Sequence, residues 1–97
     1  MPKADLLLHR RRYYDDGAIS EVKLWLLPDP VLGSMHRFKY SLFYGYPGER
    51  IVGYDNERGK GDHKHIRQQE EAYAFSTVEK LINDFLKDVQ VRREPRA

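Results

Sequence analysis

Two histidines separated by a single residue stand beside a carboxylate and a lysine in the second half of the chain. His63 and His65 follow Lys60 and Asp62 in a polar stretch, residues 54–65, that contains no aliphatic residue. In an extended segment alternate side chains point the same way, so the two imidazoles would share one face. Imidazoles titrate near neutral pH and can exchange protons with a substrate. The stretch therefore predicts a site in an exposed loop, and the alternative is a solvated, charged turn.

Cleavage of RNA is the reaction that these side chains fit best. It needs a base for the 2′-hydroxyl proton, an acid for the 5′ leaving oxygen and a cation for the charge that develops around phosphorus. We expect His63 and His65 to serve as the acid and the base. Lys60 would stabilise the developing charge, and Asp62 would orient one imidazole. Such a set needs no metal and no other cofactor.

Cationic and hydrogen-bonding side chains around this set would hold the substrate. Arginines and lysines would neutralise phosphates, and an exposed tyrosine would stack on a base. The residues that we expect to bind RNA are Arg10, Arg11, Arg12, Arg37, Lys39, Tyr54, Asp55, Asn56, Arg58 and Lys64.

A metal ion is the competing explanation for the same histidines. Imidazole and carboxylate groups are common ligands of transition metals, and Asp62, His63 and His65 could provide them. Lys60 and Lys64 lie alongside in the sequence and would repel a divalent cation, so we expect no metal. The glycine spacing matches neither a P-loop nor a calcium-binding loop.

The composition limits the classes of protein that the chain can belong to. It has 97 residues, a formal net charge of +2 and no cysteine. This length predicts a single domain, residues 1–97. Disulfides, thiolate metal sites and a cysteine nucleophile are excluded. We recognise no signal peptide and no apolar run that could span a bilayer, so we expect a cytoplasmic protein with no membrane partner.

The first half of the chain alternates in the way that half-buried strands do. Asp16-Gly17 and Pro47-Gly48 are turn sequences between such strands, and they predict two N-terminal hairpins within residues 1–56. Residues 57–71 would form a polar functional loop. The fold class is therefore α+β, with a curved antiparallel sheet of four to five strands. The strands are expected at 4–14, 18–27, 36–44 and 50–54, with a short fifth strand at 72–75.

An amphipathic helix is expected over residues 76–92, packed on one face of the sheet. Ser76 and Glu79 have the spacing of a capping box, which marks a helix start. Apolar residues then recur on one helical stripe, ahead of a basic tail at 93–97. The residues of the stripe are Val78, Leu81, Ile82, Phe85, Leu86 and Val89.

Three segments of the sequence together suggest a family. They are H-R-R-R at 9–12, H-R-F-K-Y-S-L at 36–42 and Y-D-N-E-R-G-K-G-D-H-K-H at 54–65. In this order they resemble the TumE-type toxin components of bacterial type II toxin–antitoxin modules, from about Leu6 through the C-terminal helix. The resemblance implies a small cytoplasmic growth inhibitor that a companion antitoxin with a helix-turn-helix domain neutralises. It implies no catalytic mechanism, so RNA cleavage is inferred from the side chains.

Two other functions fit the same basic loop. The domain would bind nucleic acid without cutting it, or it would dock a protein and carry no chemistry. A homodimer is compatible with each of these functions. Incubation of purified protein with labelled RNA, with and without EDTA, separates these alternatives.

Overall fold

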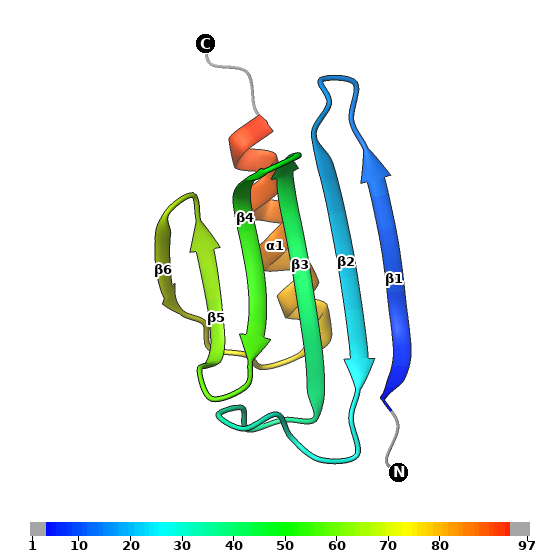
Figure 1. Cartoon of the computed structure of the whole chain (residues 1–97), viewed down its shortest axis with the longest axis vertical. Helices are drawn as coiled ribbons and strands as arrows, with labels where there is room; N and C mark the ends of the chain where they lie inside the picture. The colour runs from blue at the N-terminus through cyan, green and yellow to red at the C-terminus, as the bar shows by residue number, and fades with distance from the viewer. Residues whose placement is uncertain (1–3, 94–97) are drawn as a thin grey trace.

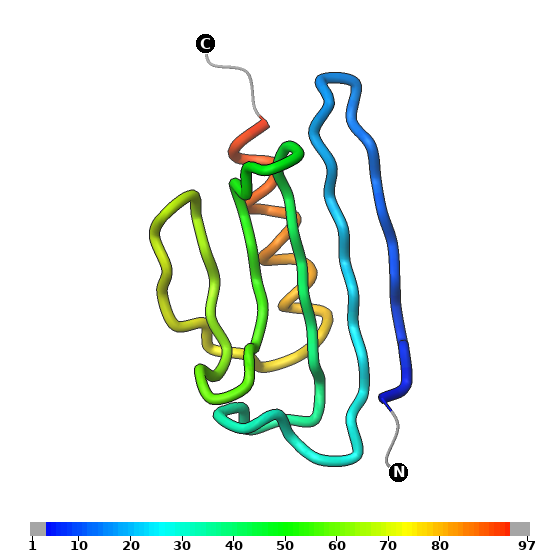
Figure 2. Tube along the Cα trace, in the orientation of Figure 1, coloured from blue at the N-terminus to red at the C-terminus, as the bar shows by residue number. Residues whose placement is uncertain are grey.

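The computed structural model describes residues 4–93, which form one antiparallel sheet and a single helix (Figure 1). The strands are β1 (Asp5–Tyr13), β2 (Ile19–Leu26), β3 (Phe38–Tyr46), β4 (Glu49–Glu57), β5 (Gly61–Ile66) and β6 (Gln69–Ala72), followed by α1 (Val78–Arg93). The spatial order β1-β2-β3-β4-β5-β6 is the order in the sequence. Each strand therefore turns back on the one before it, as the trace in Figure 2 shows.

The N-terminal half of the fold agrees with the hairpins expected from its turn sequences. Gly17 and Gly48 have φ values of 88° and 79°, which residues other than glycine rarely adopt, and each closes a hairpin. Between the two hairpins, β2 pairs with β3 from Ile19–Gly45 to Leu26–Phe38 without interruption. The α+β class, the antiparallel sheet and the C-terminal helix are confirmed.

The expectation of four to five strands is wrong, because the segment 57–71 is not a loop. It contains β5 and most of β6, and the fifth strand expected at 72–75 is instead β6 at Gln69–Ala72. The strand pattern was missed because its buried positions carry His63 and His65 rather than aliphatic side chains. β4 also continues past residue 54 to Glu57 and pairs with β5 along its last six residues, from Val52–Ile66 to Glu57–Gly61.

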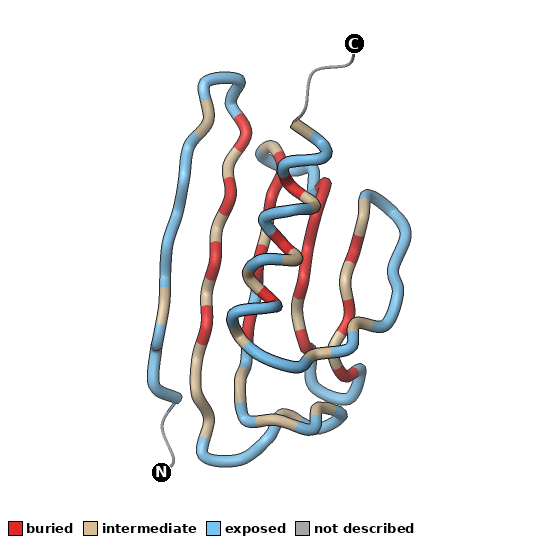
Figure 3. The backbone as a smooth tube through the Cα atoms, turned by 180° about the vertical axis from the view of Figure 1, so that it is seen from behind, coloured by how far each residue is buried: buried red, intermediate tan, exposed pale blue. Residues whose placement is uncertain are grey.

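The helix α1 covers one face of the sheet (Figures 1 and 3). Its buried residues are Leu81, Phe85 and Val89, whereas Leu86 from the same predicted stripe is 49% exposed. The Lys80 amide donates to Thr77 Oγ1 at 3.0 Å, so Thr77 caps the helix in place of the expected Ser76. The helix begins two residues later than expected and continues to Arg93, and residues 94–97 of the expected tail lie outside the described part.

The apolar core joins the helix to the strands that it covers. Its buried residues lie in β2, β3, β4 and α1 and just before β2, and Figure 3 marks buried positions along these elements. The members of this cluster are Ala18, Val22, Leu24, Tyr40, Leu42, Tyr44, Ile51, Val52, Tyr54, Leu81, Phe85 and Val89. Within residues 4–93 no other element packs on the opposite side, which we call the uncovered face. Also within this range, no helix is long and apolar enough to cross a membrane.

Candidate functional site

A row of polar side chains crosses the uncovered face from β1 to β5. Successive strand pairings connect His9 to Lys23, Lys23 to Ser41, Ser41 to Asp55 and Asp55 to His63. Directly paired residues of adjacent strands lie on the same face. The sheet therefore brings Asp55 and His63 together with groups that are far from them in the sequence.

A second row lies beside the first and contains the other histidine. It runs from Arg11 through Glu21, Phe43 and Gly53 to His65. Neither Phe43 nor Trp25, which pairs with Lys39, belongs to the core cluster on the helix side, and both are half-buried. The uncovered face thus combines aromatic rings with cations over β1–β3, and carries two imidazoles over β5.

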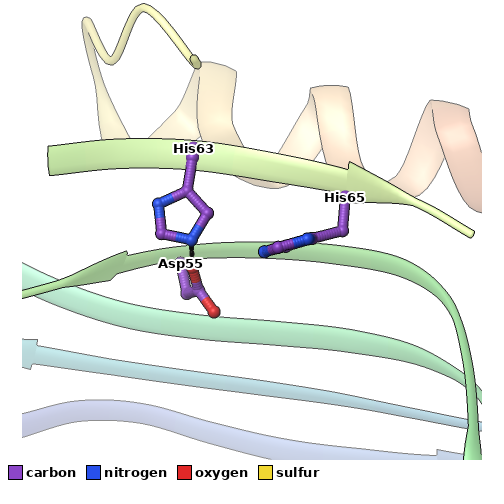
Figure 4. Close-up of side chains that lie close together, drawn as sticks. All are labelled: Asp55, His63 and His65. Carbon is purple, nitrogen blue, oxygen red and sulfur yellow. Dashed lines mark ion pairs between the residues drawn. The ribbon is translucent and has the colours of Figure 1, made fainter. Parts of the chain in front are cut away.

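Asp55, His63 and His65 form a close cluster, which we call the triad (Figure 4). His63 Nε2 lies 2.5 Å from Asp55 Oδ1, and the two imidazole centroids are 4.9 Å apart. The ligand-type atoms of the three residues all lie within 4.8 Å of one another. The histidines are 4% and 8% exposed, and His65 Nε2 is also 3.4 Å from Glu70 Oε2. The alternation expected for His63 and His65 is confirmed, and their carboxylate neighbour is Asp55.

The hydrogen bonds of the triad are incomplete. His63 Nδ1 is 3.1 Å from the Gly61 carbonyl oxygen, which can only accept, so Nδ1 carries a proton. In a neutral ring Nε2 then has a free lone pair aimed at Asp55 Oδ1. That oxygen is buried and has no hydrogen-bond partner among residues 4–93. A buried carboxylate oxygen left in this state is rare and marks a place where a further group is expected.

The surroundings of His65 favour its neutral form. Burial is the largest influence and lowers the pKa of the imidazole, and the positive charge of Arg50 lowers it further. Asp55 and Glu70 act in the opposite direction but do not cancel these effects. Arg50 lies close because Gly53 has no side chain: a Cβ atom built at Gly53 would be 2.7 Å from Arg50 Cδ.

The expected role of Asp62 beside His63 or His65 is wrong, because Asp62 lies on the helix side of β5. It accepts hydrogen bonds from Ser34 Oγ at 2.7 Å and from Tyr40 Oη at 2.7 Å, and His36 Nε2 is 2.6 Å away. Burial alone would raise the pKa of Asp62, but the hydrogen bonds from these three residues together lower it. The imidazole that Asp62 orients is therefore that of His36.

The expected contacts of Tyr54 and Asn56 with RNA are also wrong, since both side chains are buried on the helix side at 1% and 0% exposure. Asn56 Nδ2 donates to the Phe38 carbonyl at 2.7 Å, and Asn56 Oδ1 accepts from the Tyr40 amide at 3.0 Å. Tyr54 Oη donates to Asp88 on the helix. Burial, followed by this hydrogen bond, raises the pKa of Tyr54, so its hydroxyl stays protonated. These residues tie the strands together.

The lysines and arginine of the central stretch lie apart from the triad. Lys60 is in the turn between β4 and β5, and its Nζ is 3.6 Å from Glu57 Oε2. Arg58 is exposed in the same turn. Lys64 points to the helix side, 3.6 Å from Asp88 Oδ2. The charge repulsion that argued against a metal is therefore absent for Lys64, which lies on the other face.

The N-terminal basic residues divide between the two faces. Arg10 and Arg12 pair with Val22 and Ser20, and so lie on the helix side, where Arg12 Cζ is 4.7 Å from the centroid of the Tyr14 ring. Arg11 lies on the uncovered face and donates to Glu21 at 2.7 Å.

β3 and the residue before it carry the other two predicted RNA contacts. Lys39 is exposed on the uncovered face, and Arg37 is exposed just before β3. Of the expected RNA contacts, Arg11, Lys39 and Asp55 share a face with the histidines.

Several residues of the uncovered face were not predicted from the sequence. The sequence places Lys23, Trp25, Phe43 and Arg50 in strands and indicates no further role for them. The sequence shows which alternate residues of each strand share a face. Which of the two faces of β4 and β5 packs on the helix depends on the pairing between strands, and only the structure shows that pairing.

The fold and the site define the class of protein. It is a small antiparallel α+β domain that leaves one face of its sheet bare and carries a histidine–carboxylate cluster on that face. The chain belongs to the family described as Toxin TumE, whose model matches residues 3–93. The resemblance seen in the sequence is thus confirmed, and the chain has the role of a toxin with an antitoxin partner. No curated protein and no solved structure shows significant similarity to it.

Proposed function

We propose that this toxin inhibits growth by cleaving RNA on the uncovered face, with the triad as the reaction centre. The observation that carries the proposal is the pairing of His63 with a buried Asp55 oxygen that has no hydrogen-bond partner among residues 4–93. By contrast, both nitrogens of His36 have partners, because Nδ1 accepts from the Phe38 amide at 3.1 Å and Nε2 faces Asp62. The oxygens of Asp62 all accept hydrogen bonds as well, whereas Asp55 Oδ1 meets His63 Nε2 without hydrogen-bond geometry, so the Asp55–His63 pair is the less satisfied of these two pairs.

The cations and aromatic rings of β1–β3 would bind the RNA strand. Lys23 and Lys39 would neutralise phosphates, and the Trp25 and Phe43 rings would stack on bases, as aromatic residues do on sheet surfaces that bind single-stranded RNA. Three strand spacings separate Lys23 from His63 in the first row, or about 14 Å at about 4.8 Å each. A short single-stranded segment can span this distance and place a phosphodiester at the triad.

Cleavage would begin with removal of the 2′-hydroxyl proton. The 2′ oxygen attacks phosphorus, the bond to the 5′ oxygen breaks, and that oxygen takes up a proton from a protonated imidazole of the triad. The triad would supply the base: an imidazole would accept the proton, as the sequence predicts, or a metal ion held by the three side chains would provide a base by lowering the pKa of water. We assign the charge stabilisation to Arg50, in place of the expected Lys60, because the Arg50 side chain lies over Gly53 and near His65.

Cleavage of end-labelled RNA by purified protein tests this function. We expect His63→Ala and Asp55→Asn to reduce the rate by about 10²–10⁴-fold, the usual contribution of a proton-transfer group. The matched control is Lys87→Ala, which removes an exposed cation from the helix and should cleave at the parental rate. Comparison of Arg50→Ala with Lys60→Ala shows which cation stabilises the charge. Wild-type rates in both His63→Ala and Asp55→Asn would exclude the triad as the reaction centre.

Binding without cleavage is the second candidate function. It is favoured by the low exposure of the two imidazoles, 4% and 8%, next to exposed cations on the same face. Such a surface would hold RNA and prevent its use. In this case Lys39→Ala lowers both RNA affinity and toxicity, whereas His63→Ala leaves both unchanged.

The charges on the two edge strands, β1 and β6, argue against a homodimer formed by pairing of these strands. A symmetric homodimer formed through β1 would bring Arg10, Arg11 and Arg12 of two copies together, and one formed through β6 would oppose Glu70 and Glu71. Like charges on adjacent strands are destabilising, so we expect no dimer by sheet extension. The partner that we propose is the antitoxin, with the helix-turn-helix domain that the resemblance implies.

A further inference from the structure

We propose that Asp55, His63 and His65 bind a divalent first-row transition-metal ion, with Zn²⁺ as the representative ion. This replaces the expectation from the sequence that the protein uses no metal, and it also replaces the ligand set considered there, since Asp62 faces the helix. The ion would lie on the uncovered face between β4 and β5, where the three side chains point toward one another (Figure 4).

The first argument is the contact between His63 and Asp55. The Gly61 carbonyl requires the proton on Nδ1, so a neutral His63 places a lone pair 2.5 Å from a carboxylate oxygen. Two acceptors repel at this distance unless a positive charge lies between them. A proton shared by the two atoms is one such charge, although the contact lacks hydrogen-bond geometry. A metal ion is the other positive charge that would remove this repulsion, and the two donors would move apart to bind it.

The backbone contact of His63 is itself typical of a metal ligand. Ligating histidines usually donate their second N–H to a backbone carbonyl or a carboxylate, which fixes the tautomer and the ring orientation. The Gly61 carbonyl does this for Nδ1 at 3.1 Å and leaves Nε2 free to coordinate. His63 is 4% exposed, so the surrounding strands hold its ring in place.

The spacing of the donors agrees with an ion after small movements. Bonds of about 2.0–2.1 Å to Zn²⁺ place two donors roughly 3–4 Å apart. The atoms of the triad lie within 4.8 Å of one another, and the His63–Asp55 pair is closer than this at 2.5 Å. Side-chain rotation would therefore open one separation and close another by about 1 Å, without a change in strand register. Glu70 Oε2, 3.4 Å from His65 Nε2, is within reach as a fourth ligand.

The charges around the triad permit a cation. Two carboxylates, Asp55 and Glu70, face the imidazoles, whereas Lys64 lies on the opposite side against Asp88. Arg50 is a cation whose charge acts on His65, and the two carboxylates outnumber it. Two imidazoles with carboxylate oxygens are the donor set of zinc and related ions, whereas calcium and magnesium take oxygen ligands.

The ion would supply the nucleophile-activating base for the cleavage proposed above. A divalent ion held by three protein ligands lowers the pKa of a bound water to about 7, so that hydroxide is present at neutral pH. This role rests on the proposed function, whereas the binding of the ion rests only on the triad.

Metal binding is measured without RNA, so that its failure is separate from failure of the cleavage proposal. Purified chain is stripped with EDTA, dialysed and titrated with ZnCl₂ by calorimetry, and bound zinc is counted by mass spectrometry. We expect one ion per chain. His63→Ala, His65→Ala and Asp55→Asn should each weaken binding by at least about 10–100-fold, a loss that even outer groups of a metal site cause.

His9→Ala is the matched control, because His9 is an exposed histidine of the same face that is paired with Glu21 and lies three strands away from Asp55. This variant should bind zinc like the parent. Circular dichroism of each variant confirms that the loss is not unfolding, and Co²⁺ serves as a second probe whose visible absorption reports nitrogen and oxygen ligation. Equal zinc affinity in the parent and in all three triad variants would overturn the proposal, and so would the absence of binding to the parent.

Discussion

Asp62 and His36 are hydrogen-bonded at 2.6 Å although 26 residues separate them in the sequence. Phe38 N–H donates to His36 Nδ1, so the imidazole proton is on Nε2 and is donated to Asp62. The Phe75 ring stacks on the same imidazole with a centroid distance of 3.8 Å. The His36–Asp62 pair joins the loop before β3 to β5, and the stacking of Phe75 on His36 attaches the segment that leads into the helix.

Asp62 is therefore expected to stabilise the fold. Asp62→Ala leaves the donors of Ser34, His36 and Tyr40 without an acceptor in a half-buried place, and an unsatisfied buried group costs about 1–3 kcal/mol. Urea denaturation should show a loss of this size or more. Glu57→Ala, an exposed carboxylate in the same hairpin, should change stability by less than about 0.5 kcal/mol. If Asp62→Ala is as stable as the parent but inactive in RNA cleavage, the catalytic role expected from the sequence is correct instead.

The helix stripe provides a prediction about the core. Leu81 and Phe85 are 0% exposed, and replacement of either by alanine removes apolar contacts and leaves a cavity. We expect Leu81→Ala and Phe85→Ala each to lower the free energy of unfolding by about 2–5 kcal/mol. Leu86→Ala is the matched control, because that side chain is 49% exposed and should cost much less. Equal costs for Leu81→Ala and Leu86→Ala would contradict the observed face of the helix.

The carboxylate of Asp84 makes the stability of the fold depend on pH in the acidic range. The hydrogen bond from Lys80 lowers the pKa of Asp84, and the hydrogen bond from Tyr73 lowers it further. A carboxylate whose pKa is lower in the folded chain stabilises the fold above its unfolded pKa, about 3.9. This contribution is lost as the pH falls through the folded-state value. Asp84→Asn should therefore lower the melting temperature at neutral pH and reduce its dependence on pH below about 4.

A control on the same helix separates this effect from general acid unfolding. Glu79→Gln removes an exposed carboxylate from the first helical turn, and this variant should lose stability at low pH in the same way as the parent. The prediction fails if Asp84→Asn and the parent lose stability in parallel as the pH is lowered from neutral to about 2.

Binding of RNA should depend on salt in proportion to the phosphates that the uncovered face neutralises. Each phosphate contact with a single strand contributes about 0.7 to the slope of log affinity against log salt. Lys39→Ala and Lys23→Ala should each reduce the slope by roughly this amount, since both lysines lie on the uncovered face. Lys87→Ala on the helix should leave it unchanged. Identical slopes for all three variants would place the RNA elsewhere.

Turns and periodicity made most of the scaffold predictable. Asp16-Gly17 and Pro47-Gly48 close hairpins because glycine tolerates positive φ, and the apolar spacing of Leu81, Phe85 and Val89 needs only local geometry. The interpretation of residues 57–71 as a loop was wrong because hydrophobicity was used as the measure of burial. His63, His65 and Asn56 are buried through hydrogen bonds and ion pairs with residues of other strands, and these partners cannot be read from the local pattern.

The sequence by itself determined the α+β class, the helix, the N-terminal hairpins and the shared direction of the two imidazoles, because each depends on neighbours a few residues apart. Only the tertiary structure decided which carboxylate meets which histidine. Asp62 is adjacent to His63 in the sequence, but adjacent residues of a strand point to opposite faces, so Asp62 contacts His36. Asp55 reaches His63 because β4 and β5 pair with these two residues directly opposite each other. That register is a property of the whole sheet, and it places the triad on the face that the helix does not cover.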